Sequence, residues 1–189
     1  FDMDKYTIVR NGVVNDMNQI NISLLTSIFF LIIENYTQLY LEEQYSYVNN
    51  FILLMESKLN DYIKLHKLKW NKTKTLDSIK SFNFCKNIIK YIGDVLHVNI
   101  FIVSDEDITL NNTEYIKYKK NLFLINIDGY YEPLLFNNNK HLQHDAIITT
   151  GTIHPLLLMY DISFDKKCPL LETKENLDKY FLIIVSITF

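Results

Sequence analysis

The segment at residues 83–103 constrains the fold more than any other part of the sequence. Its apolar residues first recur at the spacing of one helical face, and a short run rich in β-branched residues follows directly. The helical set is Cys85, Ile88, Ile89, Ile92, Val95 and Leu96, and the strand-like run is 99–103. We therefore predict an amphipathic helix that leads into a buried strand, with Cys85 packed as a small apolar residue on the buried side of the helix.

The N-terminal third favours two long helices. Residues 20–33 form the most apolar stretch, which is roughly half the length needed to cross a bilayer and is therefore predicted to be a core helix. A short extended piece at 6–10, with a turn signal at Asn11 and Gly12, precedes it as a small hairpin or arm. A second helical stripe comprises Phe51, Leu54, Met55, Leu59, Tyr62, Ile63 and His66. We expect the two helices to pack as an antiparallel hairpin.

The rest of the chain favours strands. Residues 121–127 and 130–136 flank an Asp128-Gly129 turn, which is typical of a β-hairpin, and Pro133 predicts that its return strand lies at an edge or is bulged. Further strands are predicted at 108–110, 146–149, 156–162 and 180–187. Helices followed by strands indicate an α+β fold, here an N-terminal helical hairpin packed on a C-terminal mixed or antiparallel sheet.

A length of 189 residues with 48% hydrophobic residues suits one domain with a sizeable core. No Gly/Ser-rich or Pro-rich linker divides the sequence. We predict a single domain at 1–189, mainly helical over 1–75 and a helix plus a β-sheet over 76–189. The chain starts with Phe1 and ends on an apolar run, so we expect it to be a segment of a longer chain or assembly.

One short basic run raises the question of nucleic-acid binding, since the net charge of −3 gives no general basic field. It holds Lys64, Lys67, Lys69, Lys72 and Lys74 around His66 and Trp70. These lysines could contact phosphates while Trp70 stacks on a base. We favour the other interpretation, a solvated helix end with Trp70 folded back onto the core.

The sharpest catalytic hypothesis uses Cys85. If Ser81 or Asn83 caps the helix, Cys85 lies in its first turn, where backbone N–H groups and the helix dipole favour a thiolate. A histidine from the last third, for which we take His144, would then be the base.

At this point the sequence resembles papain-like folds, particularly viral ovarian-tumour-type (OTU) deubiquitinases. Those proteins combine a helix and an Ile/Val-rich strand with a later hairpin that bears a His-Tyr pair, and the comparable segments here are 88–103 and 122–135. The hairpin reads Gly129-Tyr130-Tyr131-Glu132 where the family has histidine, and no Asp-Gly-x-x-Cys signature stands near the N-terminus. Cys85 would also lie on a later helix than the family's nucleophile. The resemblance therefore implies a domain that lacks the family's activity.

Metal and nucleotide chemistry have weaker support. His141 and His144, with His154 or Asp145, could surround a metal ion, but their segment is typical of a loop with surface histidines. The acidic triplet at 105–107 is typical of a solvated turn. The sequence contains no phosphate-binding loop, dinucleotide glycine pattern or Gly-x-Ser-x-Gly elbow. We expect neither a metal nor a cofactor.

The composition indicates an origin more clearly than an activity. The chain uses much Asn, Ile, Tyr and Phe and almost only Lys for its basic residues, as AT-rich genomes do, and its two cysteines suit a reducing compartment. We therefore expect a viral protein in the host cytoplasm or the virion. Its aromatic residues, a type enriched in interface cores, favour a non-enzymatic structural or interaction module that binds other proteins of the same assembly. The alternative is a papain/OTU-like cysteine protease or deubiquitinase, intact or degenerate, with Cys85 as nucleophile.

Overall fold

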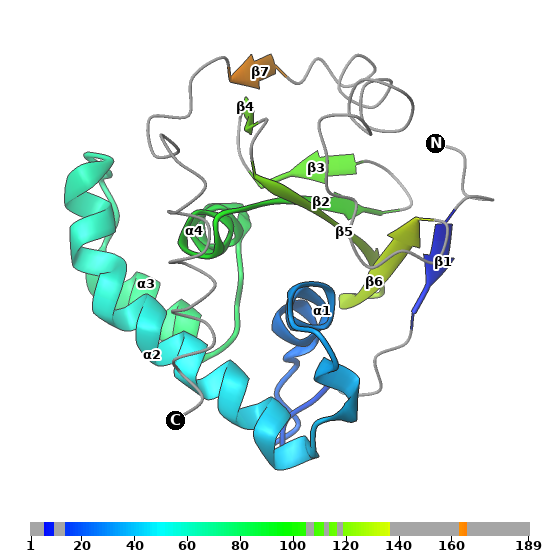
Figure 1. The fold of residues 1–189 in the computed structure, drawn as a ribbon. Helices are drawn as coiled ribbons and strands as arrows, with labels where there is room; N and C mark the ends of the chain where they lie inside the picture. The colour runs from blue at the N-terminus through cyan, green and yellow to red at the C-terminus, as the bar shows by residue number, and fades with distance from the viewer. Residues whose placement is uncertain are drawn as a thin grey trace.

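The computed structural model describes residues 6–9, 14–104, 108–111, 114–116, 119–136 and 163–165. Its centre is a mixed sheet in the order β1-β6-β5-β2-β3, in which β2 and β5 are parallel and the other neighbours antiparallel (Figure 1). A separate parallel pair joins β4 and β7. The strands are β1 (Tyr6–Ile8), β2 (Val98–Val103), β3 (Ile108–Leu110), β4 (Glu114–Ile116), β5 (Lys120–Ile127), β6 (Tyr130–Phe136) and β7 (Ser163–Asp165).

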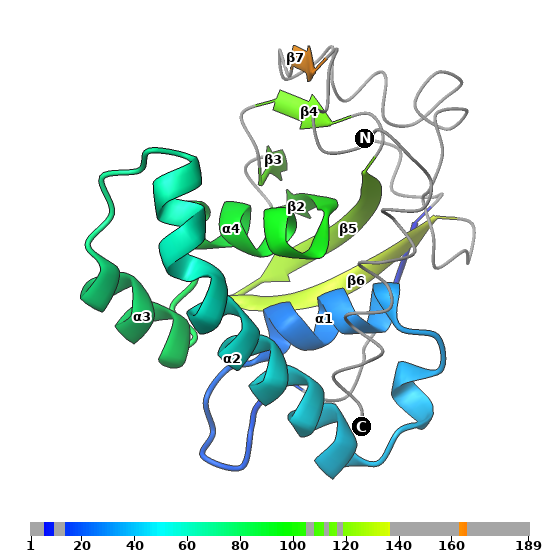
Figure 2. The ribbon, with the colours of Figure 1, turned by 60° about the vertical axis from the view of Figure 1, so that its left-hand side comes forward.

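Helices form two layers on one face of this sheet. The elements are α1 (Ser23–Ile32), the short 3-10 helix η2 (Tyr36–Gln38), α2 (Leu41–Leu65), α3 (Lys72–Lys80) and α4 (Lys86–Leu96). Helices α1 and α4 lie directly against the strands. Helix α2 lies outside these two helices, with α3 beside it (Figures 1 and 2). The predicted α+β class and the mixed sheet are therefore confirmed.

Helix α1 is the centre of the core. All ten of its residues are buried. The Phe29 ring lies 5.6 Å from that of Phe51, edge to face, and 5.9 Å from that of Tyr36, so α1 anchors the segments that follow it. The prediction of a core helix here is confirmed. Within the described part of the chain, no helix combines the length and the apolar character that a membrane span requires.

The helix and strand predicted within residues 83–103 are present as α4 and β2. Ile88, Ile89, Ile92 and Leu96 are buried, as the spacing predicts. The placement of Cys85 on the buried stripe was wrong, because Cys85 is exposed and precedes the helix as its N-cap. The reason is that Ser81 ends α3, so the connection to α4 takes up the following residues and the buried stripe begins only at Ile88.

The predicted hairpin at Asp128-Gly129 is confirmed as β5 and β6, but the edge position predicted from Pro133 was wrong. Strand β6 lies between β5 and β1. The carbonyl of Pro133 accepts a hydrogen bond from the Val9 N–H at 3.0 Å, just beyond the last residue of β1. The N–H and C=O of one strand residue point to the same neighbouring strand. Because the β1 ladder has ended at this point, the missing N–H of Pro133 costs no hydrogen bond of the β1–β6 pairing.

The predicted antiparallel hairpin of α1 and α2 is not confirmed. Figure 1 views α1 nearly along its axis, whereas α2 runs across the picture, so the two helices cross. The second stripe does bury Phe51, Met55, Leu59 and Tyr62, as predicted. The predicted turn at 11–12 and the predicted strands at 146–149, 156–162 and 180–187 lie outside the described residues.

Candidate functional site

A groove lies where β1, the segment between β1 and α1, and the β5–β6 turn come together. Its volume is about 560 Å³, within the range of sites that bind small molecules or side chains. Three of its apolar residues are partly open to solvent, with Ile8, Ile127 and Tyr130 exposed to 39%, 42% and 41%. The described residues that line it are Ile8, Val14, Ile127, Asp128, Tyr130 and Glu132.

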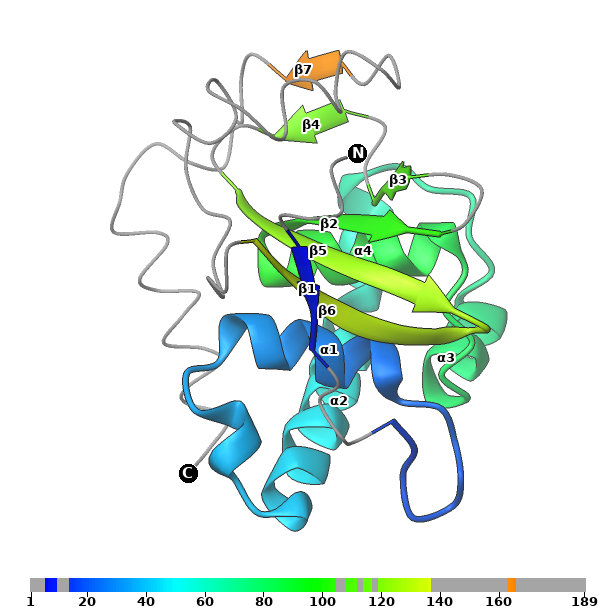
Figure 3. The same cartoon turned by 90° about the vertical axis from the view of Figure 1, so that its right-hand side faces the viewer.

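Hydrogen bonds hold the turn beside the start of α1, an arrangement visible in Figure 3. Asn21 Nδ2 donates to the Gly129 carbonyl at 2.9 Å, and the Tyr131 N–H donates to Ser23 Oγ at 3.0 Å. Ser23 Oγ in turn donates to Asn21 Oδ1 at 2.6 Å. This cluster connects the first turn of α1 to β6 and so fixes one side of the groove.

The same cluster is unsuited to nucleophilic catalysis. Ser23 is fully buried and its hydroxyl both donates and accepts within the cluster. Further along α1, Ser27 Oγ donates to the Tyr131 carbonyl at 2.7 Å, and burial raises the pKa of the Tyr131 phenol. These polar groups therefore stabilise the helix against the strand.

The groove itself combines apolar walls with carboxylates. Asp128 is an exposed turn residue with a φ of 51°, and the Asn126 side chain accepts the Gly129 N–H at 3.0 Å. Glu132 lies on β6 and is 9% exposed. The groove can accommodate an apolar side chain beside a cationic group.

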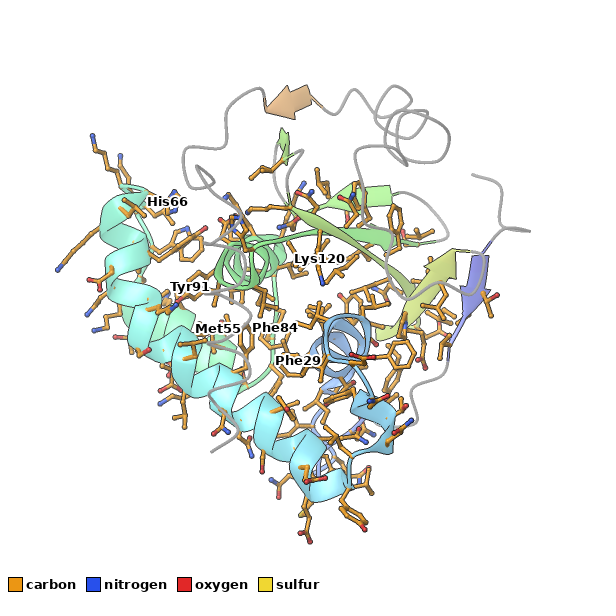
Figure 4. All side chains as sticks on the ribbon, viewed as in Figure 1. Phe29, Met55, His66, Phe84, Tyr91 and Lys120 are labelled. Atoms are coloured by element: carbon orange, nitrogen blue, oxygen red, sulfur yellow. The ribbon has the colours of Figure 1, made fainter. Side chains whose placement is uncertain are left out.

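The structure brings no described histidine to Cys85. Cys85 opens α4, whereas His97 ends it, and an eleven-residue helix is about 16 Å long. His66 follows α2, and Figure 4 shows it well apart from Phe84, the neighbour of Cys85. His144, the predicted base, lies outside the described residues, so its role stays a prediction.

A second polar cluster lies beneath the C-terminal half of α4. The Asp94 carboxylate accepts hydrogen bonds from Tyr62 Oη at 2.7 Å and from Lys90 Nζ and Lys119 Nζ at 2.8 Å each. Burial by itself would raise the pKa of Asp94, but the two lysines outweigh it and hold that pKa below its ordinary value. Burial and the Lys119 charge lower the pKa of His97 to about 4, against an opposing effect of Asp94.

The arrangement around Asp94 suits stability better than chemistry. Burial and the contact with Asp94 raise the pKa of Tyr62 far above its ordinary value, so the phenol stays neutral. Lys119 is only 5% exposed, and its charge is matched by Asp94. The cluster connects α2, α4 and the segment before β5, and it pairs the buried Lys119 with a carboxylate.

The local structure of the basic run at 64–74 agrees with a solvated helix end, in which Trp70 folds back onto the core. Trp70 packs against the core, with its ring 5.8 Å from Tyr62 and 6.4 Å from Tyr91. Asn71 caps α3 by accepting the Lys74 N–H at 3.1 Å. All five lysines of the run are exposed. Trp70 therefore does not stand among them as an open stacking platform.

The other predicted site residues are not placed. The possible metal ligands His141, His144, Asp145 and His154, and the acidic triplet at 105–107, lie outside the described residues. Within the described ranges, no group of three His, Cys, Asp or Glu side chains converges as metal ligands would.

Sequence reasoning missed the groove, although it found the turn that forms part of it. The Asp128-Gly129 signal locates the β5–β6 connection, but nothing in the sequence pairs Ile8 with β6. The Asp94 cluster was missed for the same reason, since Tyr62 and Lys119 approach Asp94 only in the folded chain.

The chain matches no protein-family model, and a search of curated proteins found no significant relative.

Proposed function

We propose that this chain is a non-enzymatic interaction module of viral origin, whose groove beside the β5–β6 turn binds a segment of another protein of the same assembly. The observation that carries the proposal is the lining of the groove. Partly exposed Ile8, Ile127 and Tyr130 offer apolar contact, and the exposed Asp128 adds negative charge. A segment that presents an apolar residue next to a lysine or arginine fits this combination.

The position of the groove supports a protein partner. It lies beside β1, which is the last strand on its side of the sheet among the residues that the structure describes. One side of it is held by the hydrogen bonds of Asn21 and Ser23 to the β5–β6 hairpin, so this side needs little ordering on binding.

The test is co-purification with products of the same genome, followed by affinity measurement. We expect the double variant Ile127→Ser/Tyr130→Ser to bind its partner at least about tenfold more weakly, because it removes two apolar walls of the groove. Asp128→Asn should keep the turn, because Asn-Gly favours the same geometry, while it weakens the salt dependence of binding.

The matched control is Leu65→Ser, at an exposed leucine on another part of the surface. It should leave the affinity unchanged. Equal binding by wild type and the double variant would contradict the assignment of the groove, and the lack of any partner would contradict the interaction module itself.

The alternative function is a papain/OTU-like cysteine protease or deubiquitinase, intact or degenerate. What favours it is the exposure of Cys85 at the start of α4. In the family that the sequence resembles, the hairpin comparable to β5–β6 carries a histidine, and here it carries Tyr130 and Tyr131. A degenerate domain without hydrolytic activity fits these residues better than an intact enzyme.

A ubiquitin or peptide reporter decides between the two functions. We expect no cleavage of either reporter. Cleavage that is lost in Cys85→Ala and in His144→Ala would establish the protease instead.

A further inference from the structure

The outward face of α2 has an internal symmetry. Leu53 is the middle residue of this helix and is 62% exposed. The exposed side chains at 4, 7 and 11 residues to either side of Leu53 continue one helical stripe. They form the pairs Asn49 and Ser57, Ser46 and Asn60, and Glu42 and Lys64.

These pairs match in chemistry. Glu42 and Lys64 carry opposite charges at equal distances from Leu53, and the four residues between them and Leu53 are small or polar and uncharged. A second α2 placed antiparallel, with a twofold axis at Leu53, therefore meets the same stripe in complementary order. We propose that a second copy of this chain binds here, to form a symmetric dimer through antiparallel α2 helices.

The contact would place apolar surface at its centre and opposite charges at its ends. Leu53 of each copy would lie against Leu53 of the other, which buries two side chains that are exposed in the monomer. Each end would pair Glu42 of one copy with Lys64 of the other. Since α2 has 25 residues, it is about 37 Å long and gives the stripe length for all these pairs.

The serines of the stripe permit close approach of the two helices. Ser46 Oγ donates to the Glu42 carbonyl at 2.9 Å, and Ser57 Oγ donates to the Leu54 carbonyl at 2.7 Å. Because both hydroxyl protons already bond within α2, these groups need not find a new acceptor when water leaves the interface. Figure 2 shows α2 on the outside of the helical layers, and the side chains of the stripe are all exposed.

A second copy is favoured over an unrelated helix because the symmetry is centred on one residue of this chain. A different partner would require only an apolar stripe or a charge pattern. For such a partner, residues at equal distances on the two sides of Leu53 need not be complementary to each other. The proposal uses a surface separate from the groove, so it stands or falls independently of the proposed function.

Sedimentation equilibrium of the full chain tests the proposal. We expect a monomer–dimer equilibrium, and an increase of about tenfold or more in the dissociation constant for Leu53→Asp, which brings two carboxylates together at the axis. Leu65→Asp is the matched control, since Leu65 is 71% exposed but lies off the stripe, and it should leave the equilibrium unchanged.

Charge reversal tests the antiparallel register. Glu42→Lys and Lys64→Glu should each weaken the dimer, because each places like charges opposite one another at both ends. The double variant Glu42→Lys/Lys64→Glu should restore the wild-type dissociation constant. Both residues also suit the α2 dipole, so far-UV circular dichroism must verify that each variant is folded.

Cross-linking tests the position of the axis. In a Cys85→Ser/Cys168→Ser background, Leu53→Cys should form an intermolecular disulfide rapidly on mild oxidation, whereas Asp77→Cys on the exposed side of α3 should not. A chain that remains monomeric at all concentrations, or a dimer that Leu53→Asp leaves intact, would overturn the proposal. So would a dimer of the double charge variant that is as weak as those of the single variants.

Discussion

At the scale of single residues, His97 gives the molecule its clearest dependence on pH. It ends α4 with a φ of 60°, and it is 6% exposed. Burial beside Lys119 lowers its pKa to about 4, so the folded chain holds a neutral imidazole at pH 5. The unfolded chain, with an ordinary pKa of about 6.5, is mostly protonated at that pH.

This difference predicts that the free energy of unfolding falls as the pH is lowered from about 6.5 to about 4. Over that range the unfolded state binds more protons than the folded state, so stability rises with pH. The loss should amount to about 3 kcal/mol and level off below pH 4. Urea unfolding at a series of pH values measures it.

The variant His97→Asn separates this effect from the carboxylates. Asparagine tolerates the left-handed backbone of this position, so the fold should persist while the part of the slope that His97 causes between pH 6.5 and 4 is lost. The contribution of Asp94 should remain. Because the pKa of Asp94 is lowered, this carboxylate stabilises the fold fully above pH 3.8, and the stabilisation is lost as the pH falls below that value. An unchanged slope in His97→Asn would show that another group titrates.

At the scale of elements, the contact of α4 with β2 and β3 depends on one glycine. A Cβ atom at Gly93 would overlap the Asn111 side-chain amide and lie 3.1 Å from the Val98 carbonyl oxygen. Asn111 in turn accepts the Ile100 N–H at 2.8 Å and so holds the end of β3 to β2. The helix can lie this close to the strands only because Gly93 has no side chain.

We therefore expect Gly93→Ala to destabilise the fold by about 1–3 kcal/mol, although alanine is the better helix former. Chemical denaturation gives the value. In a double-mutant cycle, Asn111→Ala should relieve much of the cost, since the two side chains compete for one space. Additive effects of the two substitutions would contradict this account.

The elements that the sequence predicted well are those whose signal is local. The alternation and Asp-Gly turn of β5 and β6, and the isoleucine stripe of α4, depend on neighbours in the chain. Helix α3 was missed, because its lysines and threonines give little apolar pattern and only its Asn71 cap indicates a start. The prediction that Cys85 is buried was wrong because the start of α4 depends on where α3 ends.

The groove and the Asp94 cluster required the tertiary structure. Ile8 meets β6 only through the β1–β6 pairing, and Asp94 finds Lys119 only after β2 and β5 align in parallel. No spacing along the chain encodes these contacts. The interior position of Pro133 was missed for the same reason, since it depends on where the distant β1 ends.

At the scale of the whole molecule, the helical and sheet parts share one core. Buried residues of α1, α2 and α4 pack together with Ile100, Leu122, Leu124 and Leu135 of the sheet. The only tryptophan, Trp70, contacts α2 through Tyr62 and α4 through Tyr91. Fluorescence of Trp70 therefore reports on the junction of these layers.

We expect one cooperative unfolding transition, with Trp70 fluorescence and far-UV circular dichroism coinciding in urea. Met55 is fully buried between the helices, so Met55→Ala should lower the free energy of unfolding by about 2–5 kcal/mol. The urea midpoints measured by the two probes should fall together. Asn87→Ala, at an exposed residue of α4, is the control and should move neither. Separate transitions would mean that the two layers fold independently.

The pairing of β1 with β6 also bears on synthesis of the chain. Strand β1 and the start of α1 find their partners near Tyr131, about a hundred residues after α1 has left the ribosome, which takes roughly 5–20 s. During that interval α1, whose surface is wholly buried in the finished fold, has no sheet to cover it. The nascent chain is therefore a natural client for chaperones that hold apolar helices, and this need ends when β6 emerges.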